Sequence, residues 1–220
     1  MVRLRPVATL AVLAALVTAL GAVGQAQDRR QIRRFSPEKL GELEGPDREA
    51  WQKSDAIMDA LGIADGSIVA DLGAGGGWFT VRLARRVGPR GRVYAEDVQK
   101  EMIESMNRRI TREGLHNVTI VLGTEENPGL PLKSVDAVLV VNSYAEVLKG
   151  VEWLRNVRSA LKPNGRIGIV DFRKDGWGPG PPLDERIDEA VVIKDAQAAN
   201  LRLISKDTPL PFQYLLVFGI

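Results

Sequence analysis

Short apolar runs alternate with amphipathic stretches from about residue 47 to the end of the chain. The runs predict strands, and the stretches with apolar positions three to four residues apart predict helices. The predicted strands span residues 67–70, 92–95, 118–122, 135–141, 166–170, 201–205 and 213–218, and the predicted helices span residues 47–61, 78–87, 99–113, 147–161 and 184–199. Strands that alternate with helices predict parallel βαβ units and therefore an α/β fold.

The N-terminus has a different pattern. Arg3 and Arg5 precede an uncharged apolar run over residues 7–23, and Ala26 closes a short stretch suited to cleavage. This pattern predicts a secretory signal peptide over residues 1–26 and an exported protein, periplasmic if the source is bacterial. The alternative is an inner-membrane anchor with a cytoplasmic domain, because arginines are more numerous after the run than before it. The run is short for a membrane span.

Residues 27–46 are polar without a clear period, which predicts a linker or covering arm before one domain over residues 47–220. The chain has 30 basic and 28 acidic residues, and cleavage after residue 26 would remove two arginines and leave 28 of each. A neutral domain gives little support for nucleic-acid binding, so no nucleic-acid partner is expected. Membrane contact is expected only through the N-terminal segment, and the sequence does not indicate an oligomeric state.

The chain has no cysteine and a single histidine, His116. This composition excludes disulfides, thiolate zinc sites and cysteine nucleophiles. His116 lies in a predicted turn, where a structural role is expected, and no metal site is predicted.

A glycine-rich turn follows the first predicted strand. After Asp71 come Gly73, Gly75 and Gly77, and a helix begins at Trp78. Glycines let the backbone turn tightly and approach a ligand closely, and the helix N-terminus adds free N–H donors. A dinucleotide fingerprint would have a third glycine where Trp78 stands, and no Gly-Lys-Ser/Thr of a phosphate-binding loop follows.

Asp97 closes the second predicted strand, 24 residues beyond Gly73. A carboxylate at this position of an α/β fold accepts hydrogen bonds from the hydroxyls of a ribose. The turn and the acid together predict a site for a nucleoside.

These motifs resemble those of class I S-adenosylmethionine-dependent methyltransferases. The turn over residues 71–77 is similar to that family's motif I, and three further matches follow in order, over residues 93–97, 134–138 and 161–166. The resemblance implies a Rossmann-like, doubly wound, mostly parallel seven-stranded sheet with helices on both faces. It also implies S-adenosylmethionine as the cofactor.

The resemblance assigns roles around that cofactor. The backbone from Gly73 through Gly75 to Gly77 would face its methionine end, and Asp71 would help to hold the ammonium group. Asp97 would hold the ribose.

The adenine and the methyl acceptor would lie nearby. Val98 would lie against the adenine, and Glu125 would accept a hydrogen bond from the adenine amine, with Glu126 as an alternative. Asn142, at the end of the fourth strand, would face both the cofactor and the acceptor.

Candidate catalytic residues follow Asn142. The stretch of residues 142–146 resembles a Tyr-His-Glu segment of exported-looking family members, but Ala145 replaces the histidine. Tyr144 and Glu146 remain as base or orienting groups, or as surface and helix-capping residues. Trp51 would either cover the cofactor cleft or anchor the core.

These patterns favour transfer of a methyl group from S-adenosylmethionine to a small-molecule or lipid-like acceptor. One alternative is a catalytically degenerate nucleoside-binding module, since the histidine is replaced and an exported domain would be separated from cytoplasmic S-adenosylmethionine. An NAD-dependent oxidoreductase is less favoured because of Trp78.

Overall fold

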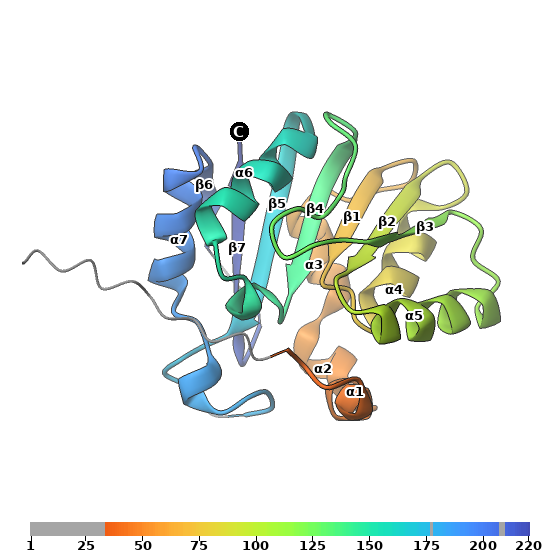
Figure 1. Ribbon diagram of the computed structural model, residues 1–220, viewed down its shortest axis with the longest axis horizontal. Helices are drawn as coiled ribbons and strands as arrows, with labels where there is room; N and C mark the ends of the chain where they lie inside the picture. Colours follow the sequence, from red (N-terminus) through yellow and green to blue (C-terminus); the bar gives the residue numbers. More distant parts are fainter. Residues whose placement is uncertain (1–33, 177, 207–209) are drawn as a thin grey trace, which may run out of the picture.

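The computed structural model describes residues 34–176, 178–206 and 210–220, so the predicted signal peptide over residues 1–26 lies outside the described residues. Seven strands form one sheet in the order β3-β2-β1-β4-β5-β7-β6 (Figure 1). The strands are β1 (Ile68–Leu72), β2 (Arg92–Asp97), β3 (Val118–Leu122), β4 (Val135–Val141), β5 (Leu161–Phe172), β6 (Arg202–Ser205) and β7 (Gln213–Gly219). Because β7 alone runs antiparallel to its two neighbours, the sheet is mostly parallel, as predicted.

Helices cover both faces of this sheet. The α-helices are α1 (Leu40–Leu43), α2 (Arg48–Gln52), α3 (Ser54–Ala60), α4 (Trp78–Val87), α5 (Lys100–Arg112), α6 (Gly150–Ala160) and α7 (Glu189–Ala198), and the 3-10 turns are η1 (Pro37–Lys39), η2 (Tyr144–Glu146) and η3 (Leu183–Glu185). One buried cluster joins the sheet to α3 and α4, and another joins it to α6 and α7. Apolar stripes on these helices explain the two layers of core.

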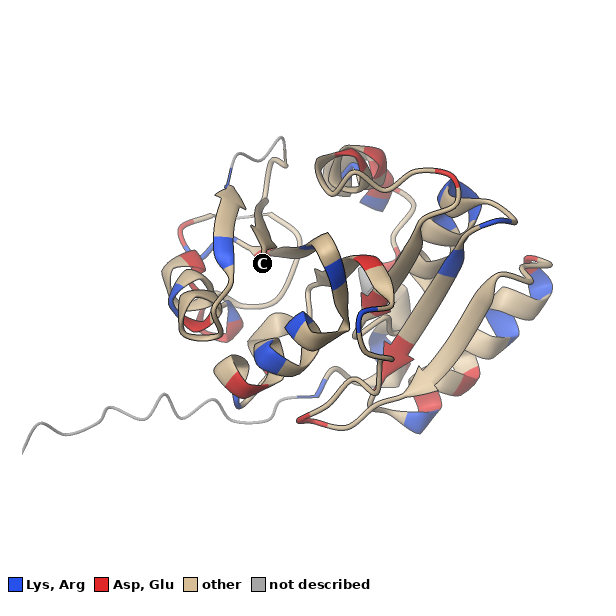
Figure 2. Ribbon diagram, turned by 90° about the horizontal axis from the view of Figure 1, so that it is seen from above, with Lys and Arg blue, Asp and Glu red and all other residues tan. Residues whose placement is uncertain are grey.

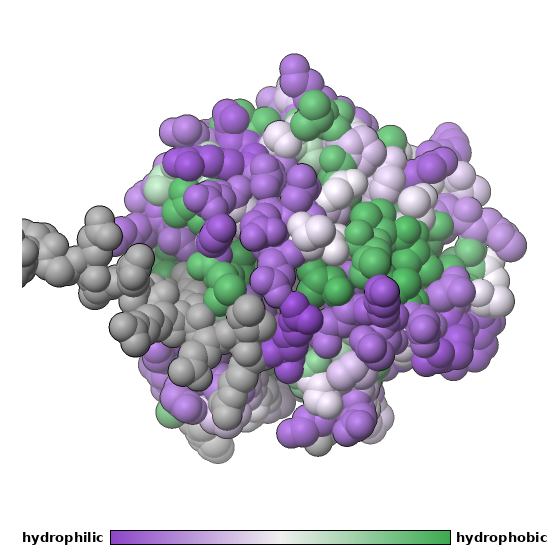
Figure 3. Space-filling model, in the orientation of Figure 1, coloured by the Kyte–Doolittle hydropathy of each residue, from purple (hydrophilic) through white to green (hydrophobic). Residues whose placement is uncertain are grey.

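The connection between β3 and β4, residues 123–134, contains no helix and crosses the sheet as a loop (Figure 1). Apolar side chains gather on the molecular surface over this region (Figure 3). Leu122 at the end of β3 and Leu132 in the loop are 51% and 74% exposed. This part of the sheet face therefore has a thinner cover than the part beneath α6 and α7.

The helix predicted over residues 47–61 is two helices. Lys53 adopts a left-handed conformation with φ 48°, and it separates α2 from α3. The Glu49 carboxylate accepts a hydrogen bond from the Ser54 backbone N–H at 2.9 Å, which caps the new helix. The break turns the two halves in different directions, so α2 packs beside the ends of the strands.

Two other boundaries differ from the prediction by five residues. The helix predicted from residue 184 begins instead after Asp188, whose side chain accepts from the Ala190 N–H at 2.8 Å. The strand predicted over residues 166–170 starts at Leu161, because Leu161 already pairs with Val135 before an irregularity shifts the register. In both cases, side-chain capping or sheet pairing overrides the local pattern.

The sheet has a switch point between β1 and β4, where successive connections leave in opposite directions. In open α/β sheets a crevice forms there at the carboxyl ends of the strands. The motif residues of the first, second and fourth predicted strands are brought to this edge. Among the described residues, no helix is long and apolar enough to cross a membrane.

Candidate active site

A pocket opens at the switch point and encloses about 1180 Å³ of space, part of it continuous with solvent. Its wall is built from the ends of β1, β2 and β4, the turns after them, and the segment that precedes α2. The lining residues are Arg34, Phe35, Leu40, Glu44, Arg48, Asp71, Gly73, Ala74, Gly75, Gly76, Trp78, Phe79, Glu96, Asp97, Val98, Gln99, Met102, Thr124, Glu125, Val141, Asn142, Ser143, Glu146, Val147 and Trp153.

The glycine turn needs its glycines. Gly73, Gly75 and Gly77 have φ values of 65°, 56° and 81°, which other residues rarely adopt. A β-carbon on Gly73 would lie 2.5 Å from the Ser143 hydroxyl oxygen, so this position has no room for a side chain. Gly73 and Gly75 line the pocket, whereas Gly77 lies behind it as the N-cap residue of α4.

Asp71 lies at the base of the turn and is 2% exposed. Its carboxylate accepts a hydrogen bond from the Thr80 hydroxyl at 2.7 Å. Burial raises the pKa of Asp71 to about 6, although Thr80 and the positive charge of Arg48 oppose the change. The carboxylate is therefore held at the pocket floor in an environment that favours a neighbouring cation.

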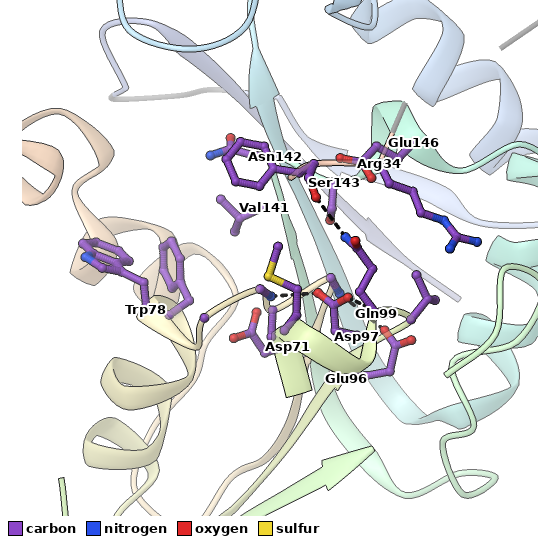
Figure 4. A pocket seen from close by; sticks show the side chains of 18 of the residues that line it. Arg34, Asp71, Trp78, Glu96, Asp97, Gln99, Val141, Asn142, Ser143 and Glu146 are labelled. Atoms are coloured by element: carbon purple, nitrogen blue, oxygen red, sulfur yellow. Dashed lines mark hydrogen bonds between the residues drawn. The ribbon is translucent and has the colours of Figure 1, made fainter. Parts of the chain in front are cut away.

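Asp97 joins the glycine turn to the second strand (Figure 4). One carboxylate oxygen accepts from the Gly75 N–H at 2.9 Å, and the other accepts from the Gln99 N–H at 2.9 Å. Burial raises the pKa of Asp97. Val98 lines the pocket next to it, so the structure brings together the residues expected to meet the ribose and the adenine.

Glu96 also lines the pocket, which the sequence analysis did not predict. It is 3% exposed, and burial, with a contribution from the negative charge of Asp97, raises its pKa to about 8. A β-carbon on Gly123 would lie 1.8 Å from its Oε1 atom, so the carboxyl packs tightly against the loop after β3. Strand alternation predicts opposite faces for residues 96 and 97, and only the end of the strand brings both to one pocket.

Asn142 follows β4 and has a φ of 58°, which turns the chain across the mouth of the pocket. Its side-chain oxygen accepts a hydrogen bond from the Gln213 amide, and Gln213 accepts from Gln52 at 2.7 Å. The buried Nδ2 atom of Asn142 has no hydrogen-bond partner among the described residues.

Glu146 lines the pocket from η2, opposite Asp97 (Figure 4). Burial, together with the negative charges of Asp97 and Asp171, raises its pKa to about 7. The backbone N–H of Phe35 donates to its carboxylate. Glu146 therefore has the accessibility and the pKa of a general base at neutral pH.

Tyr144 is not brought to the pocket. Its side chain is fully buried on the side of α6 and α7, and its hydroxyl donates to Asp195 at 3.0 Å. Its ring packs against Trp153 with centroids 6.1 Å apart. The tight 3-10 turn directs Tyr144 into the core and Glu146 into the pocket, so of these two candidate base or orienting residues only Glu146 lines the pocket.

Glu125 lines the pocket at its rim and forms an ion pair with Arg34. Glu126 is not part of the wall, and its backbone carbonyl accepts from Asn156. The Arg34 pair brings the segment of residues 34–46 across the opening. In the same segment, the Phe35 carbonyl accepts from the Gln99 amide at 3.2 Å and Glu44 pairs with Arg109.

Arg48 was also missed by the sequence analysis. It lines the pocket from α2, and it is 7% exposed. Its Nε donates to the Gln52 side chain at 2.6 Å, and its guanidinium lies 4.1 Å from the centre of the Trp78 ring. Burial lowers its pKa to about 10. A single arginine in a predicted helix does not indicate a binding site. Its role becomes visible only when the structure places α2 beside the ends of the strands.

Other candidates lie outside the pocket wall. Trp51 packs against Phe172 and Phe212, with ring centroids 5.8 and 6.4 Å apart, as a core anchor would. Asp171 is buried behind the wall, and burial raises its pKa to about 7. Within the described ranges, no group of three or more histidine, cysteine, aspartate or glutamate residues is placed to hold a metal ion.

Charge is mixed elsewhere. Basic and acidic residues are interspersed along the helices of the described chain (Figure 2). Many form exposed ion pairs, such as Arg82 with Glu49 and Arg85 with Glu113. Pairs of this kind contribute little to stability. The buried carboxyl groups of the pocket therefore form a cluster of acidic groups, unlike the mixed charges of the surface.

The comparisons with known proteins agree with this geometry. Residues 69–165 match the family model described as a methyltransferase domain. The chain is 32% identical over 125 residues to a ubiquinone/menaquinone biosynthesis C-methyltransferase UbiE from Hydrogenovibrio crunogenus, covering 56% of this chain and 48% of that protein. It is 29% identical over 154 residues to the aklanonic acid methyltransferase DauC of a Streptomyces species, covering 61% and 69%. The chain spans about half the length of several curated relatives.

A solved structure of an S-adenosylmethionine-dependent methyltransferase from Aquifex aeolicus superimposes with a TM-score of 0.80, at 26% identity, over 84% of this chain and 98% of that one. The predicted fold is confirmed. Residues 69–165 of the chain therefore match a methyltransferase domain, and the chain is similar in sequence and fold to S-adenosylmethionine-dependent methyltransferases.

Proposed function

We propose that this chain transfers a methyl group from S-adenosylmethionine to a small-molecule or lipid-like acceptor. One observation carries the proposal: the glycine turn and Asp97 line the same pocket, where the Gly75 N–H donates a hydrogen bond to the Asp97 carboxylate at 2.9 Å. The turn leaves room where a β-carbon on Gly73 would collide with Ser143. A turn of this kind allows a ligand to lie directly against the backbone.

Different pocket residues would bind different parts of the cofactor. Asp71 would attract the ammonium group, Asp97 would accept from the ribose hydroxyls, and Val98 would pack against the adenine. Glu125, which pairs with Arg34, would accept from the adenine amine. When bound, the cofactor supplies a methyl group on a positively charged sulfur, so little covalent help from the protein is required.

Electrostatics supports a cationic ligand. Burial raises the pKa values of Asp71, Glu96 and Glu146 to about 6, 8 and 7, and negative neighbours contribute to each change. These carboxyls are close enough to disfavour one another's ionisation, and Arg48 is the cation that is buried with them. A ligand with positive charge would relieve the repulsion and stabilise the ionised forms.

Glu146 acts as the general base when the acceptor carries a proton to be removed. It accepts that proton at its carboxylate, which then becomes the neutral acid. The Phe35 N–H donates to this carboxylate, which keeps further lone pairs for the proton of an acceptor. Ala145 leaves Glu146 as the base candidate in this stretch of the chain.

The acceptor we propose is a flat, weakly acidic molecule of the reduced quinone or polycyclic phenol type. Four aromatic side chains contribute to the pocket wall, Phe35, Trp78, Phe79 and Trp153, together with aliphatic side chains such as Leu40, Val141 and Val147. The names of the relatives point to acceptors of this class. An aromatic wall that includes the Glu146 carboxylate suits a ring that loses a proton as it is methylated.

A nucleoside-binding module without turnover is the second candidate. The observation that favours it is Ala145, which stands where the resemblance of residues 142–146 to a Tyr-His-Glu segment implies a histidine. An NAD-dependent oxidoreductase is disfavoured, because Trp78 occupies the position of the third glycine and is packed between Arg48 and Arg82 at 4.1 and 3.3 Å from its ring centre.

Calorimetric titration separates these functions. We expect heat with S-adenosylmethionine and S-adenosylhomocysteine and none with NAD, and we expect S-adenosylhomocysteine release in the presence of reduced quinones or polycyclic phenols. Cofactor binding without release over a broad acceptor panel would favour the binding module. Tight NAD binding without S-adenosylmethionine binding would overturn the proposal.

We further infer that residues 1–26 direct export of the chain. The support is the basic, apolar and small-residue pattern of that segment. N-terminal sequencing of the protein from fractionated cells tests it. A start after Ala26 in the exported fraction is expected, and an intact Met1 in the membrane fraction would establish the anchor instead.

A further inference from the structure

We propose that two copies of this chain form a two-fold symmetric dimer, in which their β3 strands pair antiparallel and continue the sheet from one copy into the other. The contact surface is the outer side of β3 together with the adjoining flank of α5, and we call it the β3 edge. The inference goes beyond the proposed function and does not depend on it.

One side of β3 is free, because β3 is the outermost strand of the sheet next to β2 (Figure 1). The Gly123 N–H donates to the Asp97 carbonyl of β2 at 3.1 Å. Since alternate residues of a parallel strand bond to the same neighbour, the N–H and C=O groups of Val118, Ile120 and Leu122 face the outer side. In the described part of the chain, these outward groups have no hydrogen-bond partner.

The β3 edge also lacks the features that normally protect an edge strand. Its five residues include no charge and no proline, and they pair with β2 in a regular register. The opposite edge strand, β6, carries Arg202 and has an irregular register between Leu203 and Ser205. Charges and bulges keep an edge strand from pairing with another chain. The contrast indicates that β3 is the edge that receives a partner strand.

A second copy of the chain is the partner that this strand fits. A two-fold axis at Ile120 would place Ile120 opposite its own counterpart and Val118 opposite Leu122 of the second copy. Because these residues face outward, each pair would exchange both of its backbone hydrogen bonds. The side chains of all of these pairs are apolar, which stabilises cross-strand contacts. A two-fold contact is self-complementary, so a single strand sequence serves both sides.

The adjoining flank of α5 is compatible with this pairing. α5 contacts both β2 and β3, and an ion pair between Arg109 and Glu44 ties one side of α5 to α1, which lies against the glycine turn after β1. The other side therefore faces outward, and it carries a row of uncharged side chains, Ile103, Asn107 and Thr111. Across the axis the two copies of α5 would lie two strand spacings apart, about 10 Å, which is an ordinary distance between packed helices.

The two ends of β3 carry opposite charges. Arg108 and Arg112 are exposed before the strand, where Glu113 is engaged by an ion pair with α4, and Glu125 and Glu126 are exposed after it. Antiparallel pairing brings the basic end of one copy beside the acidic end of the other, which favours this orientation. The acidic end belongs to a loop that lines the pocket, so the second copy would also support part of the pocket wall.

Sedimentation velocity of the full chain over a concentration series tests the association. We expect a dimer for the wild type, and we expect Leu122→Lys to raise the dimer Kd about 10-fold or more, because the two-fold axis places the new charge in the contact twice. Leu132→Lys is the matched control, since it makes the same change at a leucine that is 74% exposed outside the β3 edge, and it should keep the wild-type Kd. A folded Leu122→Lys variant with an unchanged Kd would overturn the proposal. A monomeric wild type would also overturn it and would favour a strand of a different protein as the occupant.

Cysteine cross-linking tests the register, because the chain has no cysteine of its own. In the proposed dimer, Ile120→Cys brings two cysteines opposite each other with α-carbons about 5.5 Å apart, whereas Leu122→Cys separates them by about 14 Å. Mild oxidation should therefore cross-link Ile120→Cys and leave the more exposed Leu122→Cys uncross-linked. Cross-linking of Leu122→Cys in preference, or no cross-linking of a folded Ile120→Cys variant, would refute antiparallel pairing about this axis.

Discussion

Glu96→Gln should make the protein more stable above neutral pH, and increasingly so as the pH rises. Glu96 is 3% exposed, and burial beside Asp97 raises its pKa from 4.5 to about 8. In the unfolded chain the same carboxyl ionises near its usual value. Between these two values the folded protein binds the proton more tightly, so the contribution of Glu96 to stability is present at low pH and is lost as the pH rises.

The magnitude follows from the two pKa values. The difference of about 3.5 corresponds to about 5 kcal/mol, since one pKa unit corresponds to about 1.4 kcal/mol. By pH 7 about 3 kcal/mol of this is lost, and the full loss is reached above pH 8. Glutamine keeps the shape of the neutral carboxyl and does not titrate. The free energy of unfolding of the variant should therefore exceed that of the wild type by an amount that grows by about 3 kcal/mol between pH 4 and pH 7.

Urea unfolding followed by tryptophan fluorescence at intervals from pH 4 to pH 9 measures this difference. Glu101→Gln removes an exposed carboxylate from α5 and controls for the change in net charge. Its curve should run parallel to that of the wild type. A constant difference between Glu96→Gln and wild type across the range would refute a raised pKa for Glu96.

Three further outcomes follow from the pocket. Asp97→Ala should weaken S-adenosylhomocysteine binding by about 2 kcal/mol, or about 30-fold, through loss of two ribose hydrogen bonds; an unchanged calorimetric affinity in the folded variant would remove Asp97 from the ribose site. Glu146→Gln should lower kcat about 100-fold and abolish the rise in rate around pH 7, because the base is lost; a wild-type pH profile in the variant would exclude this role. Tyr144→Phe should cost about 1 kcal/mol in thermal unfolding through its bond to Asp195 and leave kcat unchanged; a large loss of kcat at unchanged stability would contradict its position in the core.

Short-range patterns determined much of the fold. The helix over residues 78–87 and the strands over residues 118–122 and 135–141 agree with the structure at both ends. Their limits depend on the period of apolar positions and on nearby glycines, both of which are local properties. The turn at Gly73 was predictable for the same reason, because a positive φ favours glycine wherever the chain must bend sharply.

The tertiary structure alone decided which side chains meet. Arg48 reaches the pocket because Lys53 breaks the helix and Gln213, 161 residues beyond Gln52, holds α2 in place. Tyr144 faces the core because α7 supplies Asp195 as its partner. The direction of a side chain depends on packing against segments distant in the sequence, which no local period encodes. The sequence by itself determined the glycine turn over residues 71–77, and the tertiary structure decided which charged side chains surround it.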